Sequence, residues 1–211
     1  GANSLKHKND SNQSVRDQIE TFLNSLDVIH NELVDEDSLL ELAPKFCQVY
    51  QGYRSFLDRQ KILSFGLIIR EAVEHLQVLP IDKHPLKNYL YLFVDEYQDT
   101  NTAQEKLIEE FRRIGSEICV VGDDDQCIYE WRGSNVNNFL NFSKKYDASE
   151  YELPENRRCQ KIIFEASKSI AQKIVHRKNK SMISLSQYQP LNIKNIIADN
   201  PEEEADLIIN D

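Results

Sequence analysis

The stretch YLFVDEYQDTN, residues 91–101, changes character after its fourth residue. The run that leads into it, YLYLFV at 89–94, is aromatic and branched without polar alternation, as in a strand buried on both faces of a parallel sheet. Asp95 and Glu96 follow at once. Ligands of open parallel sheets bind beyond the carboxyl ends of the strands. The stretch therefore predicts a buried strand with a polar site at its end.

Helices and strands alternate after this strand. We expect a helix over about 102–114 that ends at Gly115, and a second buried strand at EICVV, residues 117–121. The remaining expected elements are a polar loop at 122–134, a helix over about 135–145, a strand at EYEL (150–153) and a helix that carries Ile162 to Ile174. This order is typical of a parallel α/β sheet.

The residues before this sheet favour helices. Apolar residues between Ile19 and Leu33 recur at steps of three and four, which places them on one helical face. A second helix is expected to begin at Pro44, since proline suits the first turn, and a third after Ser64. The fold class is thus α/β, with a partial parallel sheet and an N-terminal all-helical subdomain.

Composition narrows the function classes. Hydrophobic residues make up 40% of the 211 residues, enough for a core, and the net charge of −10 argues against a general polyanion-binding surface. The four cysteines form no C-x-x-C pair, so no zinc site is indicated. No apolar run is long enough for a membrane span or a signal peptide. We expect a cytoplasmic protein without a membrane partner, whose nucleic-acid contacts are local.

Polar groups follow each of three expected strands: Asp95 and Glu96, then residues 122–126, then residues 156–158. A carboxylate beside a second one suits Mg²⁺, which often takes only one or two protein carboxylates alongside phosphate oxygens. The amide of Gln126 and the cation of Arg158 are groups that phosphoryl transfer uses. One Asp-Glu pair alone is more often a helix cap or a solvated turn. Three polar strand ends at one edge favour a phosphate site.

Three stretches resemble motifs of a known family. FVDEYQDTN (93–101) and VVGDDDQCIYEWRGS (120–134) resemble motifs II and III of superfamily-1 DNA helicases of the UvrD, Rep and PcrA type, and YELPENRRC (151–159) is similar to their motif IV. The resemblance implies a RecA-like sheet of the P-loop NTPase type. It also implies three parts, a 1B-like helical subdomain at 1–85, the rest of the first motor domain at 86–190, and the start of the second at 191–211.

The resemblance implies roles toward Mg²⁺ and ATP for five residues. Asp95 would hold Mg²⁺ through the nucleotide phosphates, and Glu96 would activate the hydrolytic water. Gln126 would couple the γ-phosphate to the DNA-binding face, and Arg158 would contact that phosphate as an arginine finger. Arg157 stands where the family usually has an adenine-packing tyrosine, and a guanidinium can also stack on a ring.

The resemblance implies DNA contacts as well. Tyr129, Trp131 and Arg132 belong to the motif III stretch that reaches single-stranded DNA, and an aromatic face such as that of Trp131 stacks on bases without sequence preference. The expected partners are therefore ATP and single-stranded or partly duplex DNA.

The printed sequence contains no G-x-x-x-x-G-K-[ST] phosphate loop and no motif V or VI. We therefore expect an internal part of a longer ATP-dependent helicase that moves 3′ to 5′, inactive by itself. Two alternatives stay open. One is a helicase-like binding or regulatory module without catalysis. The other is a Mg²⁺-dependent nuclease or phosphohydrolase that uses Asp95, Glu96 and Asp123 directly.

Overall fold

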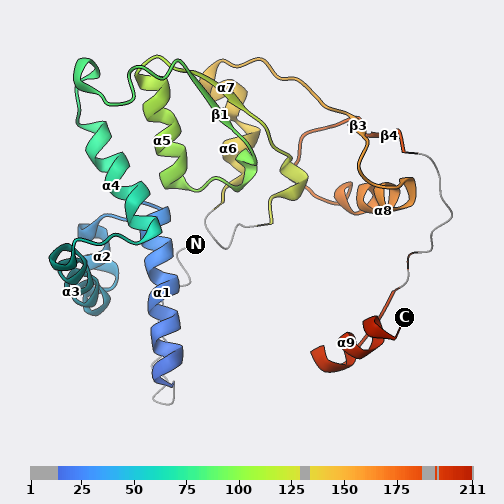
Figure 1. Ribbon diagram of the computed structural model, residues 1–211, viewed down its shortest axis with the longest axis horizontal. Helices are drawn as coiled ribbons and strands as arrows, with labels where there is room; N and C mark the ends of the chain where they lie inside the picture. The colour runs from blue at the N-terminus through green and yellow to red at the C-terminus, as the bar shows by residue number, and fades with distance from the viewer. Residues whose placement is uncertain (1–13, 129–133, 187–192, 194, 211) are drawn as a thin grey trace. The chain divides into compact units, whose positions relative to one another are not determined.

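The computed structural model describes residues 14–128, 134–186, 193 and 195–210. It divides into two compact units, Gly1–Ala148 and Ser149–Asp211, each of which is described by itself. The described residues are mostly helical and include two small parallel sheets (Figure 1). Within these residues, no helix has the length and apolar character that crossing a bilayer requires.

The N-terminal part of the first unit consists of helices with clear sequence signals at their starts. The predicted starts at Pro44 and after Ser64 are confirmed, and the Ser64 side chain accepts a hydrogen bond from Leu67 N–H. A further helix, which was not predicted from the sequence, follows Asp35, whose carboxylate accepts a hydrogen bond from Ser38 N–H. The helices are α1 (Val15–Asn31), α2 (Glu36–Leu42), α3 (Pro44–Gln60) and α4 (Phe65–Gln77).

The core of this helical part lies between α1, α2 and α3, and α4 packs against α1 (Figure 1). Arg70 of α4 is buried and donates hydrogen bonds to the carbonyl oxygens of Ile29 and Val34 at the end of α1. Carbonyls at a helix end lack helical partners, and here the guanidinium is a donor in addition to Val34 N–H, which also donates to the Ile29 carbonyl. The buried core residues are Leu26, Ile29, Leu39, Cys47 and Tyr50.

His30 gives this helical part a pH-dependent stability. Burial, and then the charges of Arg70 and Arg54, lower the pKa of His30 from its ordinary 6.5 to about 4. Between these two pH values the unfolded chain binds a proton that the folded chain excludes, so stability is lost as pH falls from 6.5 toward 4. We expect a loss on the order of 2–3 kcal/mol in urea unfolding across this window. His30→Gln should reduce the change of the unfolding free energy with pH, whereas His75→Gln, at an exposed position, should leave that change unaltered.

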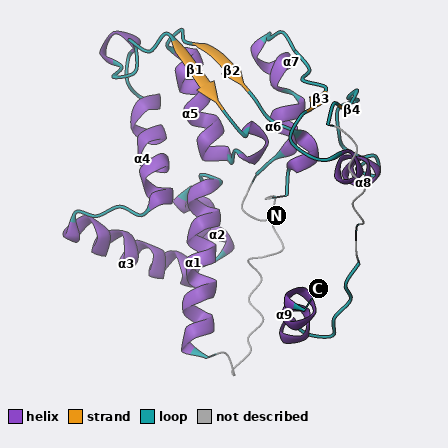
Figure 2. Ribbon diagram, turned by 45° about the vertical axis from the view of Figure 1, so that its right-hand side comes forward, coloured by secondary structure: helices purple, strands orange, loops and turns teal. Residues whose placement is uncertain are grey.

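The main sheet is a parallel pair, as predicted. β1 (Tyr91–Val94) and β2 (Glu117–Val120) pair in parallel with Tyr91 opposite Glu117. The crossover between them is α5 (Thr102–Arg113), which Asn101 caps and after which Gly115 adopts a φ of 98°. That backbone region suits glycine, and it lets the chain leave the helix and enter β2. Figure 2 shows both strands beside α5.

The prediction that β1 is buried on both faces is wrong, and so is the prediction that β2 is a buried strand, because residues of both strands alternate between exposed and half-buried. Leu92, Val94 and the facing residues of β2 pack against the cluster of Tyr97, Ile108 and Phe142, but Tyr91 and Phe93 are 66% and 76% exposed. Only one layer, made by α5 and the helices after the second strand, covers the sheet among the described residues. The apolar run of β1 has no polar alternation, yet one of its faces is exposed. Whether a strand face is buried depends on whether another layer packs on it, and the strand's own sequence does not decide that.

Two predicted elements differ from the structure in detail. The helix expected over 135–145 is two short helices, α6 (Val136–Leu140) and α7 (Phe142–Tyr146), that meet at Asn141. The Asn141 side chain donates to the carbonyl of Asn137, and asparagines that bond nearby backbone in this way weaken helices.

The prediction of a strand at 150–153 is wrong about the position of the strand. The second unit pairs β3 (Glu155–Asn156) with β4 (Ile183–Ser184), whereas Tyr151 and Leu153 are exposed. Pro154 has no N–H to donate to a ladder, and its carbonyl accepts the first ladder bond, from Ile183 N–H. The unit also contains α8 (Lys161–Ala171) and α9 (Pro201–Ile209), and the side chain of Asn200 caps α9.

Candidate functional site

The ends of β1 and β2 are joined by backbone hydrogen bonds. Val121 N–H donates to the carbonyl of Val94 over 2.8 Å, and Tyr97 N–H donates back to the carbonyl of Val121 over 3.0 Å. This exchange holds the Asp95-Glu96 turn beside the loop that begins at Gly122. The structure therefore brings together the first two of the three predicted polar strand ends, both from the first unit.

Glu96 adopts a backbone conformation that L-residues rarely use. Its φ and ψ are 51° and 42°, in the left-handed region. The other non-glycine residues with positive φ that the structure describes, Leu33, Lys61 and Asp147, each lie just after a helix, where this conformation is common. Glu96 instead lies between a strand and the short η2 turn (Tyr97–Asp99). Strain held at such a position is typical of functional sites.

The two carboxylates at this turn are exposed and differently engaged. Asp95 accepts the N–H of Glu96 on Oδ1 over 2.9 Å, and Glu96 accepts the side-chain amide of Gln98 on Oε2 over 2.8 Å. Each carboxylate keeps a second oxygen for which the described residues provide no hydrogen bond. One oxygen is thus fixed and the other is available to a ligand.

This donor set fits Mg²⁺ that arrives with a nucleotide. No group of three or more histidine, cysteine or acidic residues that could hold a metal occurs among the described residues. Mg²⁺ bound to phosphates keeps several waters and needs only one or two protein carboxylates. Asp95 can provide one such oxygen, whereas a dedicated all-protein metal cage is not present in the described part.

Asp99, at the end of η2, is a third acid of this turn. Shielding from water, and then the charge of Glu96, raise the pKa of the Asp99 carboxyl above its ordinary value. Its Oδ1 is buried and accepts no hydrogen bond from the described residues. The acid pair predicted from sequence is therefore part of a denser acidic turn, whose charge favours a cation nearby.

At the second strand end, Asp123 caps the short η3 turn (Asp124–Gln126), and Gln126 is the last residue of that turn. Asp123 accepts Asp125 N–H on Oδ1 over 3.2 Å and the side-chain amide of Gln126 on Oδ2 over 2.8 Å. Gln126 is exposed, as a group that meets a ligand must be.

A buried network that was not predicted from the sequence lies behind this site. Glu105 of α5 is 4% exposed and accepts hydrogen bonds from the hydroxyls of Tyr97 and Tyr146 and from Lys145 Nζ, over 2.6, 2.8 and 2.6 Å. Burial, together with Glu105, raises the pKa of both tyrosines far above the ordinary value, so they stay neutral donors. Burial lowers the pKa of Lys145, but hydrogen bonds to Glu105 and Glu109 outweigh it and raise that pKa.

This network fixes the residue that follows the acidic pair, since Tyr97 is fully buried and directly succeeds Glu96. The only sequence signal for the network is Glu105. A polar residue at such a position of an amphipathic helix is typical of the solvent-exposed face, so the pattern does not indicate burial.

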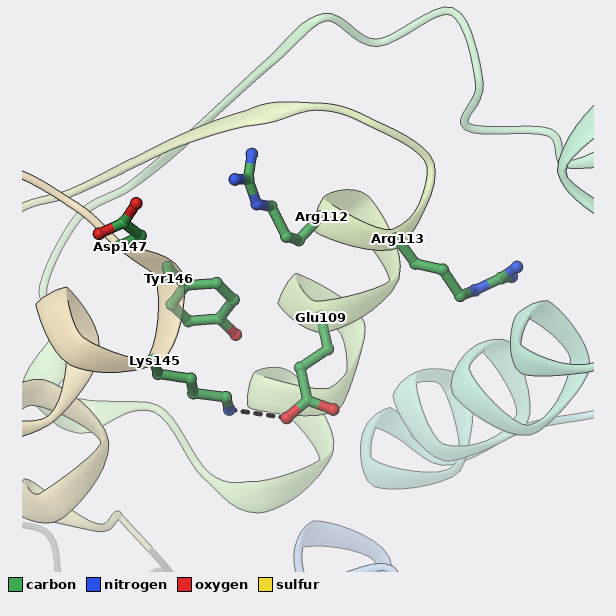
Figure 3. A pocket seen from close by; sticks show the side chains of 6 residues that line it. All are labelled: Glu109, Arg112, Arg113, Lys145, Tyr146 and Asp147. Carbon is green, nitrogen blue, oxygen red and sulfur yellow. Dashed lines mark hydrogen bonds and ion pairs between the residues drawn. The ribbon is translucent and has the colours of Figure 1, made fainter.

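A hollow of about 430 Å³ is lined in part by Lys145 and Tyr146 of this network (Figure 3). Lys145 points toward Glu109 there, while Arg112 and Arg113 point away from that pair. Cations and carboxylates are mixed in the lining, and none of the predicted site residues belongs to it. The hollow is therefore not the site of the predicted chemistry. Its lining residues are Glu109, Arg112, Arg113, Lys145, Tyr146 and Asp147.

The remaining predicted residues belong to the second unit or fall outside the described residues. Arg157 and Arg158 follow β3 in the second unit, and both are exposed. The guanidinium of Arg157 donates to the carboxylate of Glu155, with Nε 3.2 Å from Oε2. The three residues predicted to contact DNA, Tyr129, Trp131 and Arg132, fall outside the described residues.

Comparisons with known proteins agree with the family that the sequence resembles. Residues 2–147 match the model of the UvrD/REP helicase N-terminal domain. The chain is 32% identical over 182 residues to the "ATP-dependent DNA helicase PcrA" of Staphylococcus aureus (strain COL), and equally to that of Staphylococcus epidermidis (strain ATCC 12228 / FDA PCI 1200). Each alignment covers 83% of this chain and 25% of the relative, so the chain spans a quarter of the length of these curated relatives. Because the family model covers more than half of the chain, the chain belongs to the UvrD/REP helicase family.

Proposed function

We propose that this chain forms part of a longer ATP-dependent DNA helicase and contributes residues that hydrolyse ATP. The observation that carries the proposal is the pairing of the two strand ends, which places the acidic turn of Asp95 and Glu96 beside the loop of Asp123 and Gln126. The names of the relatives, which are ATP-dependent DNA helicases, support the same activity. Phosphoryl transfer depends mostly on positioning and charge, and both are provided by such a strand-end site.

The proposed roles at the nucleotide follow from what each side chain offers. Asp95 provides a charged oxygen for Mg²⁺, which when bound neutralises charge on the phosphates. Glu96 has one oxygen fixed and the other available to take a proton from water. Gln126 offers an exposed amide that can hydrogen-bond a γ-phosphate oxygen.

The proposal extends to the arginines and to DNA. Arg158 acts as an arginine finger, and Arg157 stacks on the adenine. Tyr129, Trp131 and Arg132 contact single-stranded DNA through stacking and charge. Residues 86–190 belong to a RecA-like first motor domain, 1–85 to a 1B-like helical subdomain, and 191–211 to the second motor domain. Translocation runs 3′ to 5′.

The test uses the full-length gene product with Mg²⁺, ATP and DNA. We expect phosphate release that single-stranded DNA stimulates, and unwinding of a duplex with a 3′ single-stranded tail but not one with a 5′ tail. DNA cleavage without nucleotide would instead indicate a nuclease. Nucleotide-independent DNA binding without hydrolysis would indicate a binding module.

The 211-residue chain by itself should hydrolyse ATP at less than about one-hundredth of the full-length rate, because nucleotide is not aligned without a phosphate cradle. Phosphate release is measured with Mg²⁺ and saturating single-stranded DNA, for both proteins at equal concentration. DNA-stimulated turnover of the 211-residue chain at the full-length rate would contradict this expectation.

DNA binding by the 211-residue chain should be weak and salt-dependent. The net charge of −10 opposes the polyanion, so only local groups contribute, and we expect a Kd weaker than about 1 µM that rises steeply with salt. Fluorescence anisotropy with a labelled oligonucleotide across a salt series measures both. Tight binding that is insensitive to salt would be inconsistent with contacts of this kind.

A further inference from the structure

Gln98 is a buried polar residue between the two strand ends, and the roles assigned above do not use it. Gln98 is 1% exposed, whereas the two residues that it joins are more accessible to solvent: Glu96 is exposed and Asp123 is half-buried. We propose that Gln98 is a positioning residue that links the Glu96 carboxylate, through Asp123, to Gln126, so that the proposed base and the proposed phosphate-contacting amide are held as one unit. This inference rests on the function proposed above.

The orientation of the Gln98 amide is settled by its partners. Its Nε2 donates to Oε2 of Glu96 over 2.8 Å, and its Oε1 accepts the N–H of Asp123 over 3.0 Å. A carboxylate can only accept and a backbone N–H can only donate, so a flipped amide would lose both bonds. Gln98 thus spans the gap between residues that lie 25 positions apart in the chain.

The backbone of Gln98 is also held from the second loop. The thiol of Cys127 donates to its carbonyl with sulfur 3.4 Å from oxygen, and the same sulfur lies 3.7 Å from the hydroxyl oxygen of Ser134. The side-chain amide and the backbone carbonyl of Gln98 are therefore both hydrogen-bonded to the loop that follows β2. A side chain held in this way has little rotamer freedom left, which suits a residue that orients others.

The loop leaves room for this amide because residue 122 is glycine. A Cβ on Gly122 would lie 2.5 Å from Oε1 of Gln98 and 2.8 Å from the ring of Phe139, closer than van der Waals contact allows. Neither neighbour can easily retreat, since Gln98 is buried and the ring packs in the sheet-side cluster. The close approach of Gly122 to Gln98 is therefore possible only because residue 122 has no side chain.

The link continues from Asp123 to Gln126. Asp123 receives Gln98 on its backbone N–H, and its Oδ2 accepts the amide of Gln126 over 2.8 Å. Three hydrogen bonds thus connect the Glu96 carboxylate to the Gln126 amide. When Gln126 responds to a phosphate, the displacement reaches Glu96 through these bonds.

The consequence for Glu96 is orientation of its carboxylate. Its backbone is in the left-handed region and its Oε2 is occupied by Gln98, which directs Oε1 as the oxygen that takes a proton. Geometry of this kind affects turnover rather than ground-state affinity, because the aligned proton acceptor is used in the transition state.

The first variant is Gln98→Met, which keeps the side-chain length and removes both hydrogen bonds. In the full-length gene product we expect kcat for ATP to fall at least about tenfold, the effect of losing one hydrogen bond to a charged group, with KM changed less than about threefold. In the 211-residue chain, hydrogen exchange of the Asp123 amide should accelerate at least about tenfold. Gln51→Met is the matched control, since Gln51 also donates its side-chain amide to a carboxylate, on Glu36, at an exposed place.

A second variant separates the two halves of the link. Gln98→Glu keeps an acceptor for Asp123 N–H but places a carboxylate against Glu96, so turnover should fall while Asp123 exchange stays slow. If Gln98→Met does not fold, Glu96→Ala at an exposed site replaces it, and the NMR resonances of the Gln98 side-chain amide and the Asp123 N–H should both shift.

The outcomes distinguish this inference from the proposed function. Unchanged turnover and unchanged Asp123 exchange in Gln98→Met, together with loss of hydrolysis in Glu96→Gln, would overturn the link alone. An unshifted Asp123 resonance in Glu96→Ala would also overturn it. Full hydrolysis in Glu96→Gln would instead overturn the proposed function.

Discussion

Glu96→Gln should abolish ATP hydrolysis in the full-length gene product while leaving Mg²⁺-ATP binding largely intact. The amide keeps the size of the side chain at the end of β1 but cannot take a proton from water. General-base catalysis contributes about 10²–10⁴-fold, so kcat should fall by that factor and nucleotide affinity by less than about threefold. Steady-state phosphate release and nucleotide titration with a fluorescent analogue measure the two quantities.

Asp95→Asn is the matched comparison, because it makes the same chemical change one residue earlier. It should weaken Mg²⁺-dependent nucleotide binding as well as turnover, since Mg²⁺ prefers a charged oxygen to an amide. If Glu96→Gln hydrolysed ATP within a few-fold of the unmodified protein, Glu96 would not be the base. The acidic turn would then be a structural feature of the strand end.

Glu105→Ala should destabilise the first unit by about 3 kcal/mol, because the hydroxyls of buried Tyr97 and half-buried Tyr146 lose their acceptor, whereas the more exposed Lys145 keeps Glu109. Tyr97 is fully buried, and its hydroxyl would be left without the partner that Glu105 provides. Urea unfolding of the 211-residue chain, followed by circular dichroism, measures the loss. Since Tyr97 directly follows Glu96, the same change should loosen the acidic turn.

Glu109→Ala is the control for this prediction. Glu109 accepts from the same Lys145 and from Lys106 over 2.6 Å in each case, but its side chain is 29% exposed. Exposed pairs contribute less than about 1 kcal/mol, so this variant should remain close to the original stability. Equal losses in the two variants would contradict the assignment of Glu105 as the centre of the network.

Much of the secondary structure could be predicted from sequence because its signals are local. Ser64 marks a helix start through a contact within one turn, and Pro44 marks one through its fixed φ, and both starts are confirmed. The strands β1 and β2 were predicted from short runs of aromatic and branched apolar residues. The errors lie where local signals conflict, as at Asn141, where a helical pattern contains asparagines that bond backbone nearby.

The sequence by itself determined the acidic strand end, the family and the parallel connection through α5, because residue type and spacing carry that information. Only the tertiary structure decided which side chains are buried and which groups meet across the strands. Tyr91 and Phe93 are exposed because no layer among the described residues covers their face. Gln98 and Glu105 are central because partners far along the chain reach them, Asp123 in one case and Tyr146 in the other. Such hydrogen bonds depend on how the strands and helices pack, which no local pattern specifies.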